Sequence, residues 1–385
     1  MSKVGTGEKI SVFASSHITE AFGPVQALKS YLIKKFSKFI FVEHPFTYSK
    51  ISSSKLDTFR GSLLSAQEKR SVKGPLDMEL ISYVSNFALT IYWFLKVGRK
   101  TKIFIGIDAL NAFAGAFLKF FGFKFKLVYY SVDFNPKRFK NPILNSFYHC
   151  IDKLALKNAD YVWNSSKRIA TVRRGQGVAE KKNLVVHNGT DINKIEGKVV
   201  NKDRNTLVIV EHLTSEKGVQ LVIKSLRKIR KINKEAKVVV VGTGPFEDNL
   251  KAMAKRYKVS KHINFVGSMS PNKYREELGS FGIGLCLYEG NKNDSAYFSD
   301  PISPKEFFGA GLPVVVTDIL WIAEDVEKEK LGKVISYNEE DLTKTLNELW
   351  NEKGLYKECS DNAKDYIKKF SWTSIFEKTF EKMEF

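Results

Sequence analysis

The sequence has few of the features that mark secreted, metal-binding or membrane-spanning proteins. Its 385 residues include three cysteines, Cys150, Cys286 and Cys359, which are isolated and lack the spacing of metal ligands. We therefore expect a reduced, cytoplasmic compartment and no bound metal. The first ten residues contain no apolar segment of the kind found in signal peptides. The longest uncharged stretch, 80–95, would reach about 24 Å as a helix, which is short of the roughly 30 Å core of a bilayer.

Acidic residues are scarce in the first half of the chain, and this concentrates the positive charge there. Residues 1–192 contain 30 Lys and Arg against 13 Asp and Glu, a net charge of +17, whereas residues 193–385 contain 32 against 29, or +3. A net charge of this size is informative about binding partners and does not indicate the fold. The first half is therefore expected to meet something anionic, such as nucleic acid, an acidic membrane surface or a phosphorylated acceptor.

Short apolar runs alternate with amphipathic segments, which is typical of parallel α/β domains. With 43% hydrophobic residues the chain can form two cores, and the usual domain size of roughly 100–200 residues predicts two domains. The basic, Ser- and Gly-rich stretch 49–75 is predicted to be a mobile loop. The predicted strands of the first half are 9–14, 39–43, 102–107, 125–130, 160–164 and 184–187. A first predicted helix ends at about residue 36, and the later ones span 82–96, 109–121 and 141–158.

The alternation restarts after a polar connector at 192–205. Ligands of doubly wound sheets bind beyond the carboxyl ends of the strands, so we expect a site in a cleft between two such domains. We place their limits at 1–192 and 193–365, followed by an amphipathic C-terminal helix within 366–385. The predicted strands and helices of the second half are 206–211, 219–230, 236–242, 247–257, 263–266, 274–279, 283–288, 341–351 and 355–369.

The stretch 298–318, FSDPISPKEFFGAGLPVVVTD, combines a polar loop, a short helix and a buried strand. Ser303 is a suitable N-cap and Pro304 suits the first helical turn. The backbone amides of Lys305 and Glu306 would then be free at the helix end, where the helix dipole favours an anion such as a diphosphate. An ordinary helix–strand unit with a Pro entry and a Gly exit is the alternative.

This motif resembles the donor-nucleotide motif of GT-B glycosyltransferases, especially family 4, the group 1 nucleotide-sugar transferases. In that family, the Glu five residues before the Gly holds the ribose hydroxyls of the nucleotide. Glu306 occupies this position before Gly311. A second Glu, eight residues earlier, usually contacts the donor sugar, but this chain has Phe298 there. Asp300 is the nearest carboxylate and the candidate replacement.

The segment EHLTSEKGV, at 211–219, follows the first predicted strand of the second half. In the family this place has Gly-Arg-Leu and then Lys-Gly, and the Arg and Lys neutralise the donor diphosphate. Lys217 and Gly218 match this pattern, whereas His212 replaces the Arg. The resemblance implies that Lys217 stabilises the departing diphosphate without a metal. A solvated lysine in a loop is the alternative.

The turn VGTGP, at 241–245, resembles the family's glycine-rich turn between a strand and a helix. It implies that Gly242 and Gly244 lie near the donor, although Gly-x-Gly alone is common in tight strand-to-helix turns. The later segment HINFVGSMS resembles the family's next strand and base-contacting loop. This resemblance places the nucleotide base near Val266.

Candidates for acceptor chemistry lie in the first half. Where many relatives have a His beside the acceptor, this chain has Asp133, and a carboxylate near a sugar hydroxyl can accept its proton. An Asp that caps the following turn is the alternative. His17 and His44 are further acceptor-side candidates, although most single histidines are structural or lie on the surface. Lys137 and Arg138 begin a basic rim.

The resemblance implies an α/β protein with two doubly wound Rossmann-like domains facing a cleft, and a C-terminal helix that packs back on the first domain. It predicts a glycosyltransferase of hexosyltransferase type that takes a sugar from a UDP- or GDP-linked donor and needs no cofactor. Asp133, Lys217 and Glu306 are the expected catalytic residues. The family favours retention of the anomeric configuration, while Asp133 and the missing first Glu leave inversion open. A sugar-nucleotide epimerase of the same fold and a non-catalytic or nucleic-acid-binding relative are the alternatives.

The charge of the first half adds a prediction about the acceptor. We expect an anionic or lipid-linked glycan acceptor and a peripheral location on the acidic inner face of a membrane. Basic residues interleaved with aromatic ones would also suit nucleic acid. The doubly wound repeat with a donor motif argues against that partner, so no nucleic acid is expected.

Overall fold

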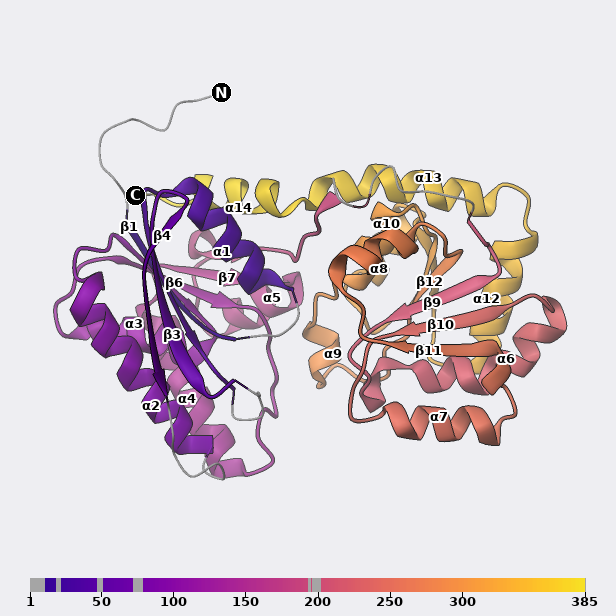
Figure 1. Cartoon of the computed structure of the whole chain (residues 1–385), viewed down its shortest axis with the longest axis horizontal. Helices are drawn as coiled ribbons and strands as arrows, with labels where there is room; N and C mark the ends of the chain where they lie inside the picture. Colours follow the sequence, from indigo (N-terminus) through magenta and orange to yellow (C-terminus); the bar gives the residue numbers. More distant parts are fainter. Residues whose placement is uncertain are drawn as a thin grey trace. The chain divides into compact units, whose positions relative to one another are not determined.

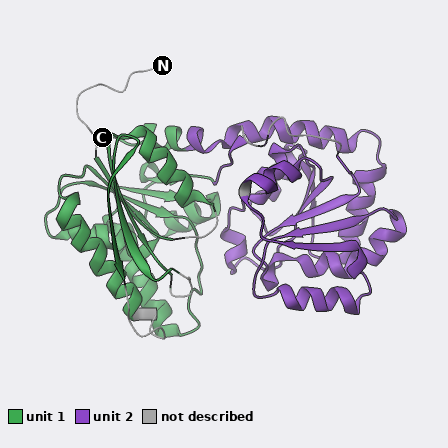
Figure 2. Ribbon diagram, in the orientation of Figure 1, with its two compact units in different colours: residues 1–187, 376–385 green, residues 188–375 purple. Residues whose placement is uncertain are grey.

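The structure is a computed structural model that describes residues 11–18, 22–46, 51–71, 79–192, 195 and 202–384. The chain forms two compact units (Figures 1 and 2). Unit 1 comprises the described residues up to His187 together with those from Phe376 onward, and unit 2 comprises those from Asn188 to Ile375. Each unit has its own sheet, which confirms the predicted α/β architecture with two doubly wound domains. Residues 9 and 10 of the first predicted strand and most of the predicted connector lie outside the described residues.

Unit 1 is organised around a sheet with the strand order β4-β3-β2-β1-β5-β6-β7-β8 (Figure 1). Neighbouring strands from β2 to β8 are parallel, whereas β3 and β4 run antiparallel to their neighbours. The central strands are buried along most of their length, as expected where helices cover both faces of a parallel sheet. The strands are β1 (Ser11–His17), β2 (Lys38–His44), β3 (Ser53–Arg60), β4 (Leu63–Ser71), β5 (Ile103–Ile107), β6 (Lys126–Ser131), β7 (Tyr161–Asn164) and β8 (Asn183–Val185).

Strands β3 and β4 lie where the sequence predicted a mobile loop, so that prediction is wrong for them. In β3, Leu56 and Phe59 are buried, but β4 exposes nearly all of its side chains. A strand with both faces in water has no hydrophobic alternation, and its place is determined by backbone pairing with β3. Its lysine and arginine are typical of an exposed sheet edge. Residues 49–50 and 72–75 of the predicted loop lie outside the described residues.

The helices of unit 1 begin at polar caps. The side chains of Asp108, Asn141 and Ser166 accept hydrogen bonds from first-turn amides of α3, α4 and α5. Gly106 in β5 lets the start of α3 approach closely, because a Cβ at this position would lie 2.3 Å from the backbone of Ala112. The helices are α1 (Pro24–Lys35), α2 (Glu79–Trp93), which continues into a π-helical turn (Phe94–Gly98), α3 (Ala109–Phe120), α4 (Pro142–Asn158) and α5 (Lys167–Gly175), of which α5 was not predicted.

Unit 2 has a six-stranded parallel sheet with the order β11-β10-β9-β12-β13-β14. Successive residues of β9 alternate between two hydrophobic clusters, because Val208 belongs to one and both Leu207 and Ile209 belong to the other. The core therefore lies on both faces of the sheet. The strands are β9 (Thr206–Val210), β10 (Lys237–Val241), β11 (Ile263–Gly267), β12 (Ile283–Cys286), β13 (Val314–Thr317) and β14 (Gly332–Ile335).

The helices of unit 2 alternate with these strands and continue past the last one. They are α6 (Val219–Ile232), α7 (Glu247–Arg256), α8 (Pro271–Leu278), α9 (Ser295–Phe298), α10 (Ser303–Gly309), α11 (Ala323–Lys328), α12 (Glu339–Asn351) and α13 (Leu355–Ile367). None of the helices within the described ranges combines the length and apolarity needed to cross a bilayer.

The C-terminal helix α14 (Trp372–Glu381) brings the end of the chain into unit 1. The ring of Phe376 lies 5.4 Å from that of Tyr31, and the ring of Phe380 lies 5.7 Å from the same tyrosine. Phe380 also packs edge-on against Trp163, with 5.2 Å between centroids. The predicted return of the C-terminal helix to the first domain is confirmed.

Candidate functional site

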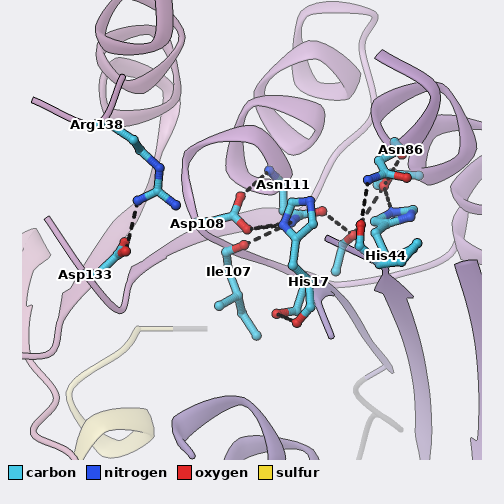
Figure 3. Close-up of polar contacts among 12 residues, drawn as sticks. His17, His44, Asn86, Ile107, Asp108, Asn111, Asp133 and Arg138 are labelled. Carbon is cyan, nitrogen blue, oxygen red and sulfur yellow. Dashed lines mark hydrogen bonds and ion pairs between the residues drawn. The ribbon is translucent and has the colours of Figure 1, made fainter. Parts of the chain in front are cut away.

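The strand order of unit 1 reverses beside β1, which pairs with β2 on one side and with β5 on the other. Ligands of doubly wound sheets bind outside the carboxyl ends of the strands at such a switch point. Strand β1 ends at His17, and β5 ends directly before Asp108. The switch point of unit 1 therefore carries a histidine and a carboxylate (Figure 3).

His17 and Asp108 form a hydrogen-bonded pair, with 2.6 Å between Nδ1 and Oδ2. Asn111 holds this carboxylate in place, since its backbone amide donates to Oδ1 over 3.1 Å and its side-chain amide donates to Oδ2 over 3.0 Å. Burial acts to raise the pKa of Asp108, but the His17 ring and the Asn111 amide outweigh it and keep that pKa below its usual value. Asp108 is therefore ionised at neutral pH and accepts the Nδ1 proton of His17.

The second ring nitrogen of His17 is buried without a protein partner. His17 is 5% exposed, and its Nε2 meets no hydrogen-bond partner among the residues that the structure describes. A buried polar atom of this kind is uncommon in folded proteins. Because Nδ1 donates to Asp108, Nε2 is left as an acceptor.

A cavity of about 190 Å³ lies beside this pair, within unit 1. Its polar lining includes His17, Asp108 and Arg138. Helices α2, α3 and α4 contribute most of the remaining lining, which is mainly apolar. The cavity therefore suits a hydrocarbon group whose polar end reaches His17. Two apolar side chains from each helix are Val84 and Phe87, Leu110 and Phe113, and Leu144 and Phe147.

His44 does not line this cavity, so its prediction as an acceptor-side residue is wrong. Its side chain is fully buried, and both ring nitrogens have partners, Nδ1 with Ser54 at 2.9 Å and Nε2 with Thr90 at 2.7 Å. Burial lowers the pKa of His44 well below its usual value. His44 is therefore a neutral core residue, and it packs 6.1 Å from the His17 ring, centroid to centroid.

Asp133 lies apart from this pair in an exposed ion pair with Arg138 (Figure 3), with 2.9 Å between Oδ2 and Nη1. The Asp133 side chain is 57% exposed. The Arg138 guanidinium therefore occupies Oδ2 of Asp133. Lys137 is exposed, whereas Arg138 lines the cavity. The acceptor roles of Asp133 and Lys137 stay predictions.

The strand order of unit 2 reverses beside β9, which pairs with β10 and β12. Glu211 follows β9, and Tyr288 lies just beyond β12. The Tyr288 hydroxyl donates to both carboxylate oxygens of Glu211, at 2.8 and 2.9 Å, and Ser303 donates to Oε1 at 3.0 Å. The Nζ of Lys217 lies 3.2 Å from Oε2. A carboxylate, an ammonium and two hydroxyls thus meet at the switch point of this unit.

Lys217 is held at this point by two contacts and is not a freely solvated lysine. Besides its ion pair with Glu211, its Nζ lies 3.8 Å from the centroid of the Tyr288 ring. The side chain still keeps 21% of its surface exposed, so an anion can reach it. His212, in the position of the family's Arg, is exposed. The contacts of both residues with a diphosphate stay predictions.

The three glycines predicted near the donor bring the loops of unit 2 into close contact. Gly218 and Gly242 have φ angles of 73° and 124°, and a Cβ would lie 1.6 Å from the carbonyl oxygen of Leu287 or 1.9 Å from that of Glu211. A Cβ on Gly244 would lie 2.3 Å from another loop carbonyl. Larger residues would displace Glu211 and its loop, so these glycines shape the switch point. Their contact with a donor stays a prediction.

Asp300 and Lys305 form a fully buried ion pair, with 2.5 Å between Oδ1 and Nζ. The Lys305 ammonium also donates to the Asn188 carbonyl at 2.6 Å. Asp300 accepts from the backbone amide of Asn188 at 2.6 Å and from the Trp321 indole at 2.9 Å. The prediction that Asp300 contacts the donor sugar is wrong, and so is the prediction that the Lys305 side chain contributes to donor binding. Both side chains are fully buried and paired with each other inside unit 2.

The predicted anion site at the start of α10 is also wrong. Ile302 is the N-cap of this seven-residue helix, and no side chain caps it. The backbone amides of Lys305 and Glu306 both donate to the Ile302 carbonyl, at 2.9 and 3.1 Å, so neither is free. The hydroxyl of Ser303 is turned to Glu211 instead of the helix end. Pro304 is buried in the first turn.

Glu306 lies on α10 and faces α8. Burial raises the pKa of Glu306 to about 7, although the Tyr274 hydroxyl and the Arg275 guanidinium act to lower it. A carboxyl group with such a pKa changes charge near neutral pH. Val266, which was predicted near the base, is half-buried at the end of β11. Contacts of Glu306 with ribose and of Val266 with a base stay predictions.

A family model described as glycosyl transferases group 1 matches residues 191–366, a segment that lies within unit 2. This segment is a group 1 glycosyltransferase domain. It contains the switch point with Glu211 and Lys217, and it also contains Glu306. The family resemblance found in the sequence motifs is thereby confirmed.

Two curated relatives align with parts of the chain. The uncharacterised glycosyltransferase MJ1069 of Methanocaldococcus jannaschii is 27% identical over 259 residues, which cover 64% of this chain and 64% of that protein. The alpha-monoglucosyldiacylglycerol synthase of Streptococcus pneumoniae is 21% identical over 187 residues, which cover 46% of this chain and 41% of that protein. The chain thus spans less than two thirds of the length of these relatives.

A solved structure matches over nearly the whole chain. Anabaena Alr3699/HepE in complex with UDP has a TM-score of 0.71 at 15% sequence identity, with 97% of this chain and 98% of that chain covered. At this identity the likeness concerns the fold. The glycosyltransferase domain and unit 1 together have the GT-B fold.

Three residues of the two switch points were not singled out in the sequence. Asp108, Glu211 and Tyr288 each follow an apolar run directly. A polar residue at the end of such a run is the available signal. The sequence did not show which strands are neighbours in the sheet, and only that arrangement brings Asp108 to His17.

Proposed function

We propose that the protein is a glycosyltransferase that moves a sugar from a nucleotide-diphosphate sugar, UDP- or GDP-linked, to a hydroxyl of a lipid-linked acceptor. The observation that carries this proposal is the apolar cavity lined in part by His17 and Asp108, in a chain whose unit 2 contains a group 1 glycosyltransferase domain. The complex of HepE with UDP supports a nucleotide-sugar donor.

In this proposal unit 2 holds the donor. Lys217, partly exposed at the switch point, neutralises charge on the departing diphosphate, which is the work that a bound metal does in other enzymes. Glu306 accepts hydrogen bonds from the ribose hydroxyls. The reaction then proceeds without a metal ion, and by family resemblance it retains the anomeric configuration.

The lipid part of the acceptor is supported by apolar surface around the cavity. Val84 and Phe147 line the cavity and are 60% and 54% exposed, so its mouth is apolar. From Phe87 inside the cavity, rings continue to Phe117 at 5.4 Å and on to Phe121 at 4.7 Å, at the end of α3. Exposed apolar patches of this kind mark binding sites for proteins, membranes or ligands.

The charge of the first half of the chain supports attachment to an acidic membrane surface. The half of the chain that contains the cavity carries the net charge of +17, from 30 basic and 13 acidic residues. A basic side chain near an acidic leaflet contributes roughly 1 kcal/mol. The Streptococcus pneumoniae relative is named as a synthase of a glucosyldiacylglycerol. Diacylglycerol is therefore the first acceptor to test. We place the protein on the inner, cytoplasmic face of the membrane.

The test is a transfer assay with UDP-glucose and GDP-mannose as donors and mixed vesicles of phosphatidylglycerol and diacylglycerol as the acceptor surface. We expect a glycosylated lipid from one donor, with nucleotide diphosphate released in equal amount. Product NMR then reports the anomeric configuration. Isomerised nucleotide-sugar without transfer would indicate an epimerase. Absence of transfer to diacylglycerol and to polyprenyl phosphate acceptors, with transfer to a soluble glycan, would overturn the lipid assignment.

A further inference from the structure

We propose that unit 1 has a second ligand site, a basic cavity that binds a small molecule carrying two or more phosphate groups. The cavity has a volume of about 630 Å³, which is within the roughly 300–1,000 Å³ typical of small-molecule pockets. It is bounded by the C-terminal ends of α4 and α5 and by the helical turn Glu180–Lys182. Binding here requires neither donor nor acceptor, so this inference is independent of the proposed glycosyl transfer.

The basic cavity is separate from the switch point of unit 1. Strands β7 and β8 begin at Tyr161 and Asn183, and the lining residues Ala159 and Lys182 lie just before these starts. The basic cavity is therefore at the amino-terminal edge of the parallel strands, whereas His17 ends β1 at their carboxyl edge. The two cavities of unit 1 also have different lining residues. A ligand in the basic cavity would thus bind apart from the switch point.

The wall of the basic cavity is positively charged. Lys153 and Lys157 come from α4, one helical turn apart, and Lys182 comes from the turn before β8. None of the described residues that line the cavity is acidic, and within the described ranges the three lysines form no ion pair. Like charges one turn apart repel each other, so the arrangement favours a bound anion. A lysine near a helix C-terminus also stabilises the helix, which accounts for Lys157 but not for Lys182.

The acidic residues of this region are paired with other cations. Asp152, Asp160 and Glu180 are close to the cavity in the sequence, and each has a basic partner. These partners are Arg173 at 2.5 Å, Lys119 at 2.8 Å and Arg174 at 2.9 Å, respectively. The three carboxylates are thus engaged elsewhere. The charge of the three cavity lysines is therefore available to an anion from solution.

A hydrogen-bond donor in the cavity wall is held in a fixed orientation. Gln176 lines the cavity, and its Oε1 accepts from Nη1 of Arg173 at 2.9 Å. A guanidinium can only donate, so the side-chain oxygen of Gln176 must face it and the amide nitrogen is turned away. Arg173 is itself 1% exposed and held by Asp152. Gln176 therefore offers its two N–H donors to a phosphate oxygen in the same cavity.

The remaining lining leaves room for the carbon skeleton of a ligand. Leu156, Ala159 and Val178 line the cavity and are buried, so they provide an apolar surface. Gly175 and Gly177 also line it, and a Cβ on either would have no heavy atom within 4 Å. The lysines come from two separate elements, which favours a ligand with at least two phosphates. Phosphates of this kind occur on soluble metabolites and on lipid headgroups.

The first experiment titrates the full chain with inorganic tripolyphosphate in a calorimeter. Lys153→Gln combined with Lys157→Gln removes two cations from the cavity. Lys224→Gln combined with Lys231→Gln, at exposed positions of α6, removes the same charge elsewhere and is the matched control. We expect the cavity variant to bind at least tenfold more weakly than wild type, and the control within twofold of wild type. Tripolyphosphate bound at Lys217 in unit 2 would be unaffected by the cavity variant, so the loss identifies the site.

The second experiment places a negative charge in the cavity without removing a lysine. Gly175→Asp does this at a position where an added side chain meets no neighbour, and Gly175→Asn is the uncharged control of the same size. Both variants should melt close to the wild-type temperature. We expect Gly175→Asp to bind tripolyphosphate at least tenfold more weakly, and Gly175→Asn within threefold of wild type.

Vesicles that contain phosphatidylinositol bisphosphate are the second probe, and they distinguish the two sources of phosphate. Vesicle binding that is lost in the Lys153 and Lys157 double variant would identify a lipid headgroup, whereas binding of tripolyphosphate without vesicles would identify a soluble compound. Equal binding of tripolyphosphate to wild type and to this folded double variant, or absence of binding to either probe, would overturn the site. Since no sugar donor is present, a failure of glycosyl transfer would leave these results unchanged.

Discussion

The ammonium of Lys217 lies 3.2 Å from the carboxylate of Glu211 and 3.8 Å from the centre of the Tyr288 ring. The lysine proposed for the diphosphate is therefore held by a carboxylate at the switch point of unit 2. A diphosphate that approaches must compete with Glu211 for this charge. The ion pair positions Lys217. It also limits how strongly Lys217 binds the diphosphate of the intact donor, before the bond to the sugar breaks.

We expect Lys217→Ala to depress turnover more than donor affinity. The ammonium interacts most strongly with the charge that develops as the diphosphate leaves, so its loss should lower kcat by about 10²-fold or more, with a smaller rise in the donor dissociation constant. Steady-state kinetics and calorimetry with the nucleotide-sugar measure the two effects. Activity that disappears in EDTA and returns with a metal ion would contradict the metal-free mechanism.

Glu211→Gln offers a comparison at the same point. It keeps hydrogen-bonding atoms for Tyr288 and Ser303 but removes the charge that competes for Lys217. We expect tighter binding of nucleotide diphosphate in this variant and weaker discrimination between donor and product. Unchanged product affinity would show that the Glu211 pair does not restrain Lys217.

We expect donor affinity to depend on pH through Glu306. Burial raises the pKa of Glu306 to about 7, so the ionised form that binds ribose is lost as the pH falls through that value. Between pH 8 and pH 6 the affinity for UDP-glucose should fall about tenfold, as the ionised fraction does. Glu306→Gln should bind about 1–3 kcal/mol more weakly, without this pH dependence. Calorimetry at several pH values tests both, and a wild-type affinity that is constant over this range would refute the ribose contact.

Lys305→Met should destabilise unit 2 without acting on the donor. It leaves the Asp300 carboxylate buried without its cation, which typically costs about 3–5 kcal/mol. Lys330→Met is a matched control, because its ion pair with Glu358 is exposed and should be worth less than about 1 kcal/mol. Urea unfolding curves followed by fluorescence give both values. Equal stability of the two variants would contradict the importance of the buried pair.

The motif that contains Lys305 separates what could be predicted from the sequence from what could not. The order of residues was enough to predict the doubly wound architecture and to single out Lys217 and Glu306, because both depend on local pattern and family resemblance. It did not show that Lys305 and Asp300 are buried, since that follows from contacts with Asn188 and Trp321, which are distant in sequence. Burial decides whether a charged residue meets a ligand or supports the core.

On the acceptor side, too, the sequence did not show which distant residues meet. His17 was a candidate from its place after the first strand, but nothing local linked it to Asp108. Their contact requires β1 and β5 to be neighbours, and the residues between them include β3 and β4, which were predicted as a loop. Pairing between distant strands depends on the whole sheet, so a partner formed in this way needs the fold to be known.

The protein should bind acidic membranes through unit 1. Electrostatic attachment weakens as salt shortens the Debye length from about 10 Å at 0.1 M to about 3 Å at 1 M, whereas insertion of Ile143 and Phe147 from α4 should resist salt. We therefore expect co-sedimentation with phosphatidylglycerol vesicles at low salt and partial release at 1 M salt. When both side chains are changed to Ser, release at 1 M salt should be complete. Ile232→Ser, at an exposed apolar position of unit 2, is the control and should bind as wild type does. Equal pelleting with neutral vesicles, or none with acidic vesicles at low salt, would overturn this location.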